Sequence, residues 1–165
     1  AFGQAMVTFT GQNIGAGNRE RIRKGAIICN VFSAAVIMGI SAAVLCFGRP
    51  ILNIFCGEEE VIVEGLKIIR TTFPFYFVYA ILEVTGGIVR GNKKTMQSMA
   101  IVIVNLCVIR VLLLSIFTEH FHSIHAVAAV YPVTWILAAL SFVLYYYRIS
   151  RQEKYKYVFV MDRIS

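Results

Sequence analysis

The sequence has little charge for its length. Of its 165 residues, 15% are Asp, Glu, Lys or Arg, whereas 58% are hydrophobic, and the mean hydropathy is +0.72. A soluble domain carries about a quarter of its residues as charged side chains, so this composition excludes an ordinary soluble fold. It favours a membrane protein.

Cysteine is also scarce, and its placement excludes a disulfide framework or a zinc site. Cys29, Cys46 and Cys107 lie inside apolar segments, only Cys56 lies in a predicted loop, and no metal-ligand spacing occurs. The segment from Glu119 to His125 contains three histidines with a single carboxylate, which indicates a solvated loop rather than a metal site. We therefore expect no metal and no cofactor other than a coupling ion.

The sequence contains no evident catalytic set. No histidine lies within a predicted span, and Ser33, Ser41 and Ser115 have no evident base, so we expect no enzyme. The formal net charge is +7, but the basic residues gather in short segments between apolar ones. This pattern indicates membrane topology rather than nucleic-acid binding.

Four apolar segments are long enough to cross a bilayer as helices, which takes about 20 residues. They are residues 25–48, 71–89, 95–118 and 126–147, and residues 1–10 read as the end of a fifth helix. The sequence therefore predicts an all-α, polytopic transmembrane helix bundle. Because the chain starts within a predicted helix, we expect it to be part of a longer protein.

The basic residues also predict the orientation. They concentrate in the first loop (residues 19–24), in the turn at 90–94 and in the polar tail at 149–165 with the preceding Arg148. By the positive-inside rule these segments face the cytoplasm. The acidic turn at 58–60 and the histidines then face outward across the plasma membrane.

The segment between Arg70 and Arg90 contains one charged residue, Glu83. Seven residues separate Glu83 from Arg90, which places the carboxylate roughly 10 Å inside the cytoplasmic end of its helix. A charge at that depth is costly unless it is protonated, paired or hydrated, so Glu83 is a candidate cation-coupling residue or a paired structural carboxylate. Pro74 predicts a kink, and the Gly86–Gly87 pair predicts a close helix contact.

Other polar side chains in the spans are candidate cavity residues. Most residues of the aromatic segment at 73–79 are expected to contact lipid or neighbouring helices. Tyr76 and Tyr79 are the preferred candidates for binding flat organic cations, because their hydroxyls need partners in a dry interior. Asn105 is either a substrate contact or a structural hydrogen-bonding group. Arg110 is expected to lie about 14 Å above Glu83, too far for a direct ion pair, and therefore to line the cavity or bind another partner.

Three motifs together resemble the multidrug and toxic compound extrusion (MATE) family. GQNIGAG at 11–17 precedes a basic cluster, IVRG at 88–91 precedes a lysine-rich turn, and YPVTW at 131–135 opens the final span. The motif residues with expected structural roles are Gly11, Gln12, Asn13, Gly15, Arg90 and Gly91.

The resemblance implies a twelve-helix transporter with two six-helix lobes and alternating access. Residues 1–148 would form part of the C-terminal lobe, from the end of helix eight to helix twelve, and would need the N-terminal lobe of the same chain. The implied activity is Na⁺- or H⁺-coupled export of small organic cations from a lipid-embedded protein. Alternatives are a lipid-linked oligosaccharide flippase of the same superfamily and an inactive truncated remnant. Counting back from Arg90 places the family's coupling carboxylate near Tyr79, about one turn from Glu83.

Overall fold

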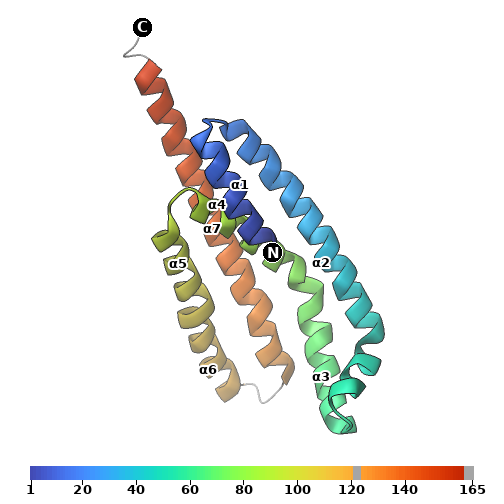
Figure 1. Ribbon diagram of the computed structural model, residues 1–165. Helices are drawn as coiled ribbons and strands as arrows, with labels where there is room; N and C mark the ends of the chain where they lie inside the picture. Colours follow the sequence, from blue (N-terminus) through green and yellow to red (C-terminus); the bar gives the residue numbers. More distant parts are fainter. Residues whose placement is uncertain (121–123, 162–165) are drawn as a thin grey trace.

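The computed structural model describes residues 1–120 and 124–161, and every element in this part of the chain is a helix (Figure 1). The elements are α1 (Phe2–Gly15), α2 (Arg19–Phe55), α3 (Glu59–Thr72), η1 (Phe73–Phe75), α4 (Tyr76–Gly91), α5 (Thr95–Val102), η2 (Ile103–Ile109), α6 (Arg110–His120) and α7 (Ile124–Met161). Within the described residues, four helical stretches are long and apolar enough to span a membrane: 19–55, 59–91, 95–119 and 124–151. The predicted all-α polytopic bundle is confirmed.

The helix of the first span does not end near residue 48, the boundary that the sequence predicts. Helix α2 continues to Phe55 and is instead interrupted at Phe47, whose backbone has φ −108° and ψ 16°. A proline inside a helix lacks the N–H that would bond four residues back, and its ring crowds that carbonyl. Pro50 therefore disturbs the turn before it, and the helix resumes after the kink.

The second span begins earlier than predicted. Helix α3 starts at Glu59, where Glu59 and Glu60 place negative charge at the positive end of the helix. Pro74 lies in η1, the 3₁₀ turn that joins α3 to α4 without a loop. The predicted tail also differs, because α7 continues as a helix from the final span through residues 149–161.

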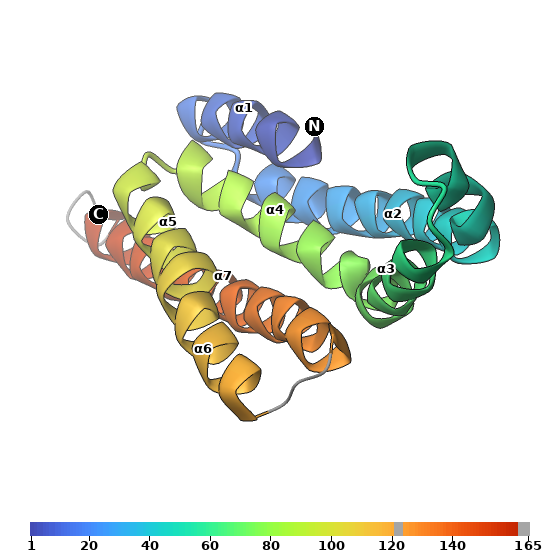
Figure 2. The same cartoon turned by 90° about the horizontal axis from the view of Figure 1, so that it is seen from below.

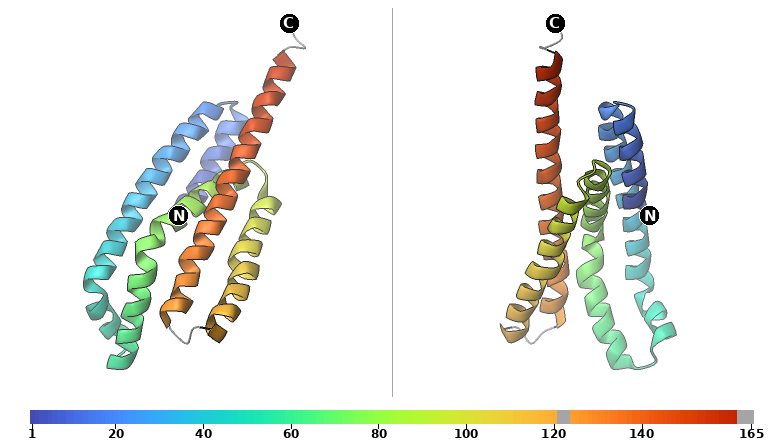
Figure 3. Two further views of the ribbon diagram at one scale, coloured as in Figure 1. Left: turned by 180° about the vertical axis from the view of Figure 1, so that it is seen from behind. Right: turned by 60° about the vertical axis from the view of Figure 1, so that its left-hand side comes forward.

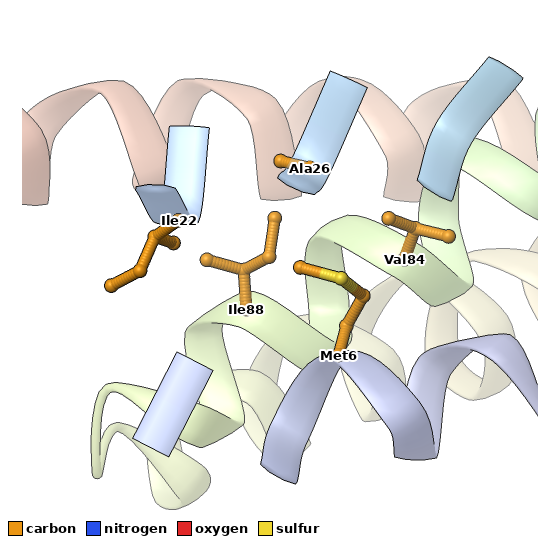
Figure 4. Packing of buried hydrophobic residues seen from close by; sticks show 5 residues of the cluster. All are labelled: Met6, Ile22, Ala26, Val84 and Ile88. Atoms are coloured by element: carbon orange, nitrogen blue, oxygen red, sulfur yellow. The ribbon is translucent and has the colours of Figure 1, made fainter. Parts of the chain in front are cut away.

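Helix α4 occupies the middle of the bundle, where it packs against α1, α2, α5 and α7 (Figure 2). Its buried residues are Ala80, Leu82, Val84, Thr85, Gly86, Gly87, Ile88 and Val89. One core cluster joins Val84 and Ile88 to Met6 of α1 and to Ile22 and Ala26 of α2 (Figure 4).

A second core cluster lies on the opposite side of α4. Leu82 and Val89 pack there against Ala138, Ala139 and Phe142 of α7. The small side chains at 138 and 139 allow α4 and α7 to approach closely. Helix α4 thus connects the two halves of the bundle.

The ends of the helices group into two opposite sets (Figures 1 and 3). The turns joining α1 to α2 and α4 to α5 lie toward the end at which α7 leaves the bundle. The turn joining α2 to α3 lies at the other end, together with the end of α6 and the start of α7. Two of the basic segments that the sequence assigns to the cytoplasm, at 19–24 and 90–94, and the described part of the third therefore lie toward one end.

Candidate functional site

Glu83 lies on α4 beside a cation from its own helix. Its Oε2 is 3.9 Å from Nη2 of Arg90, and the Glu83 side chain is 39% exposed. Residues seven apart lie two turns along the same helix face, which explains why the two side chains meet. This pair is not among the contacts predicted from the sequence, where the same spacing gives only the depth of Glu83.

Helix α1 comes very close to α4 at the level of Glu83. A Cβ added to Gly3 would collide with the Glu83 carboxylate and lie 2.9 Å from the Glu83 carbonyl oxygen. A Cβ at Gly87 would collide with the Gly3 carbonyl oxygen, and one at Gly91 would lie 2.6 Å from Cβ of Thr10. Glycine at these three positions lets the two backbones touch.

An aromatic cluster connects α4 with α7. The Tyr76 ring lies 4.9 Å and the Tyr79 ring 5.7 Å from the ring of Trp135, both edge to face, and Tyr131 lies 6.4 Å from Trp135. Edge-to-face pairs at these distances are the favoured arrangement of aromatic rings. Beside the cluster is a cavity of ≈ 310 Å³ lined by residues of α3, η1, α4 and α7, among them Tyr76, Tyr131 and Trp135.

Arg110 joins this cluster from α6. Its Nε and Nη2 donate hydrogen bonds of 3.1 and 2.8 Å to Oγ1 of Thr134, and its guanidinium lies 4.7 Å from the centre of the Tyr131 ring. Thr134 is fully buried and donates in turn to the Tyr131 carbonyl oxygen at 2.9 Å. Arg110 thus has a hydroxyl and an aromatic face as partners, whereas Glu83 has Arg90.

Asn105 also faces α7, because the third span contains a π-helical segment. Its Nδ2 donates to the Ile101 carbonyl oxygen at 2.9 Å and lies 3.4 Å from Oγ of Ser141. In an α-helix, Asn105 and Arg110 would be about 140° apart around the axis. The wider turns of η2 bring residues five apart onto one face. On that face Arg110 contacts Thr134 and Asn105 contacts Ser141, and these two partners are seven residues apart on one face of α7.

The candidate residues therefore form two groups joined by α4. Glu83 and Arg90 lie close to α1. Tyr76 and Tyr79 contact Trp135, and Arg110 contacts Tyr131 and Thr134. Asn105 contacts α7 at Ser141, two helical turns beyond Thr134.

Sequence reasoning missed three residues of this region: Thr134, Trp135 and Ser141. Two signals could have found them. Trp135 belongs to the YPVTW motif, and Thr134 and Ser141 share a face of the final span because they are seven residues apart.

The GQNIGAG motif forms the end of α1 and the turn into α2. Asn13 is buried, and its side-chain Nδ2 donates to the Phe9 carbonyl oxygen at 2.8 Å. The backbone carbonyl oxygen of Asn13 accepts a hydrogen bond from the Asn18 N–H at 2.8 Å. Gly17 has φ +68°, a left-handed conformation that glycine adopts without strain. Asn18 then caps α2 by accepting a hydrogen bond from the Arg21 N–H.

The histidines singled out above are only partly described. His122 and the side chain of His120 lie outside the described part of the chain. Nδ1 of His125, at the start of α7, lies 3.2 Å from Oγ1 of Thr71 on α3. This contact joins the last turn of α3 to the start of α7.

The bundle and its polar interior define a multi-pass membrane protein, and comparison with known families identifies its class. The MatE family matches residues 1–116, well over half of the chain. The chain therefore belongs to the MatE family, whose members are transporters, and the resemblance noted in the sequence is confirmed.

Three curated relatives share parts of the chain. Multidrug and toxin extrusion protein 1 of Danio rerio is 33% identical over 56% of this chain and 16% of its own length. The probable multidrug resistance proteins YpnP of Bacillus subtilis and NorM of Thermotoga maritima are 25% and 26% identical, over 67% and 71% of this chain. Each match covers 25% of those relatives, so the chain spans a quarter or less of the proteins it matches. No solved structure matches.

Proposed function

We propose that this chain forms part of a Na⁺- or H⁺-coupled transporter that exports small organic cations across the plasma membrane by alternating access. In this proposal it works with an N-terminal lobe of the same protein, and its tail faces the cytoplasm. MatE membership supports an efflux role, since the relatives are named for multidrug extrusion or resistance. The observation that carries the proposal is the carboxylate of Glu83, which lies on the central helix at the α1 contact.

The loose pairing of Glu83 suits an exchange of cations. A charge-assisted hydrogen bond is about 2.7–2.9 Å long, so the 3.9 Å separation from Arg90 leaves the carboxylate weakly engaged. A proton or Na⁺ that reaches Glu83 can therefore compete with Arg90. Because Glu83 also rests against Gly3, a change in its charge or partner alters the contact between α1 and α4.

The aromatic cluster suits the substrate side of the exchange. The faces of Tyr76, Tyr79 and Trp135 can bind a flat organic cation through stacking and cation–π contacts. Tyr79 lies one turn from Glu83 on the same helix. Ion binding at Glu83 and substrate binding at the aromatic cluster would therefore influence each other through α4.

Replacing Glu83 tests the coupling. Glu83→Gln keeps the size of the side chain and removes its charge, so efflux of ethidium driven by a Na⁺ or proton gradient should be lost while the protein is still produced. Glu64→Gln is the matched control, because Glu64 on α3 pairs with Lys67 of its own helix. Export by Glu83→Gln at the parent rate, at every pH and Na⁺ concentration, would assign Glu83 a structural role only.

A further inference from the structure

A second cavity lies between α1 and α2, away from the aromatic cluster. Its volume is ≈ 440 Å³. Helix α2 contributes one continuous stripe to its wall, formed by Arg21, Lys24, Ile28, Cys29 and Phe32. Residues spaced by three and four lie on one helix face, so the stripe is charged at its start and apolar along the rest.

The apolar part of this groove is closed by side chains of α1 on one side and exposed on the other. The Phe9 ring of α1 packs directly onto Gly25, and Phe2 meets Phe32 edge to face at 5.9 Å. Ile28 is 69% and Phe32 60% exposed, on a helical stretch that is long and apolar enough to span a membrane. The exposed apolar side chains on the open side of the groove therefore suit contact with an acyl chain.

The length of the groove matches one leaflet of a bilayer. Eleven residues separate Arg21 from Phe32, which corresponds to roughly 16 Å along a helix. Half of the hydrocarbon thickness is about 15 Å. One acyl chain can thus lie along Ile28 and Phe32 while its headgroup stays at the level of Arg21.

The charged end of the groove suits a phosphate. Lys24 pairs with Glu20 at 2.8 Å, but both side chains are more than 70% exposed, and such surface pairs contribute little to stability. A phosphate can therefore recruit Lys24 together with Arg21. The positive end of the α2 dipole adds to the attraction.

We propose that the groove between α1 and α2 is a binding site for an anionic phospholipid, with the phosphate on Arg21 and Lys24 and an acyl chain along Ile28, Cys29 and Phe32. Basic pockets between spans at the cytoplasmic side are a recognised setting for such headgroups. The site is separate from Glu83 and from the aromatic cluster, so the inference does not depend on the proposed transport function.

Cys29 provides a direct measurement, because it lines the groove. In a variant that keeps Cys29 as its one cysteine, purified in a neutral detergent, the rate of modification by N-ethylmaleimide reports occupancy. Phosphatidylglycerol should slow the reaction, whereas phosphatidylcholine and inorganic phosphate should not. Arg21→Gln or Lys24→Gln should each weaken protection about fivefold, and the double variant about 25-fold.

Arg23→Gln is the matched control, since it removes the same charge two residues away from Arg21, on another face of α2. It should leave protection by phosphatidylglycerol nearly unchanged. Native mass spectrometry of the unaltered protein should show phosphatidylglycerol retained in preference to phosphatidylcholine. Equal protection by phosphatidylcholine, protection by inorganic phosphate, or an equal effect of Arg23→Gln would overturn the proposal.

Discussion

Gly87→Ala provides the sharpest test of the contact between α1 and α4. An added Cβ would collide with the carbonyl oxygen of Gly3 and lie 3.1 Å from both the Gly3 carbonyl carbon and Cβ of Met6. These atoms belong to the backbone of α1 or lie next to it, so no side-chain rotation relieves the clash. Helix α1 must move away from α4.

The size of the effect follows from a matched pair of variants. Overpacking of this kind costs about 1–3 kcal/mol. Alanine also favours a helix over glycine by about 0.8–1 kcal/mol, which offsets part of that cost. Gly39→Ala on α2 has the same helix gain, and its Cβ would meet nothing within 4 Å. The difference between the two variants therefore isolates the clash.

The assay is reversible unfolding in mixed micelles with increasing sodium dodecyl sulfate, followed by circular dichroism. Gly87→Ala should be less stable than Gly39→Ala by about 1–3 kcal/mol, equivalent to about a 5- to 150-fold change in the unfolding constant. Gly91→Ala should behave like Gly87→Ala, since its Cβ would lie 2.7 Å from the Val7 carbonyl oxygen. Equal stability of the Gly39 and Gly87 variants would refute the close packing of α1 on α4.

Three further predictions address topology, stability and the substrate cavity. An impermeant thiol reagent added to intact cells should label Cys56 in a variant without other cysteines, because the turn between α2 and α3 is predicted to face outward. Thr134→Val should destabilise the protein by about 1.5–3 kcal/mol in the micelle assay, because it removes the acceptor of both Arg110 hydrogen bonds. Ethidium should quench the fluorescence of Trp135, the one tryptophan in the sequence, and Tyr76→Ala should weaken that quenching.

Each of these predictions has a control. A cysteine introduced at Asn92 should stay unlabelled, and labelling there with protection of Cys56 would reverse the orientation. Thr118→Val should have little effect, because the exposed Thr118 donates to carbonyl oxygens of its own helix. Quenching that is equally strong in the Tyr76 variant would place the dye away from the aromatic cluster.

The sequence by itself determined the number of spans, because each apolar segment must satisfy its own backbone hydrogen bonds in lipid and therefore forms a helix. It determined less well the residues at which the helices begin and end. The polar residues at 59–70 do not favour lipid, yet α3 continues through them, since a helix can extend beyond the hydrocarbon. The predicted end of the first span lies just before Pro50, but the cost of that proline falls on one turn only, and α2 continues beyond it. The Glu83–Arg90 pair was also accessible from the sequence, as an i, i+7 spacing.

Only the tertiary structure decided which side chains meet across helices. In a soluble protein, polar residues mark the outer face of a helix, but a span is apolar both toward lipid and toward its neighbours. The sequence therefore could not show that Tyr76 faces Trp135. Nor could it show the π-helical segment η2. That segment turns Arg110 and Asn105 onto the face that meets Thr134 and Ser141. These partners lie more than 20 residues away along the chain, so local sequence patterns do not reveal the contacts.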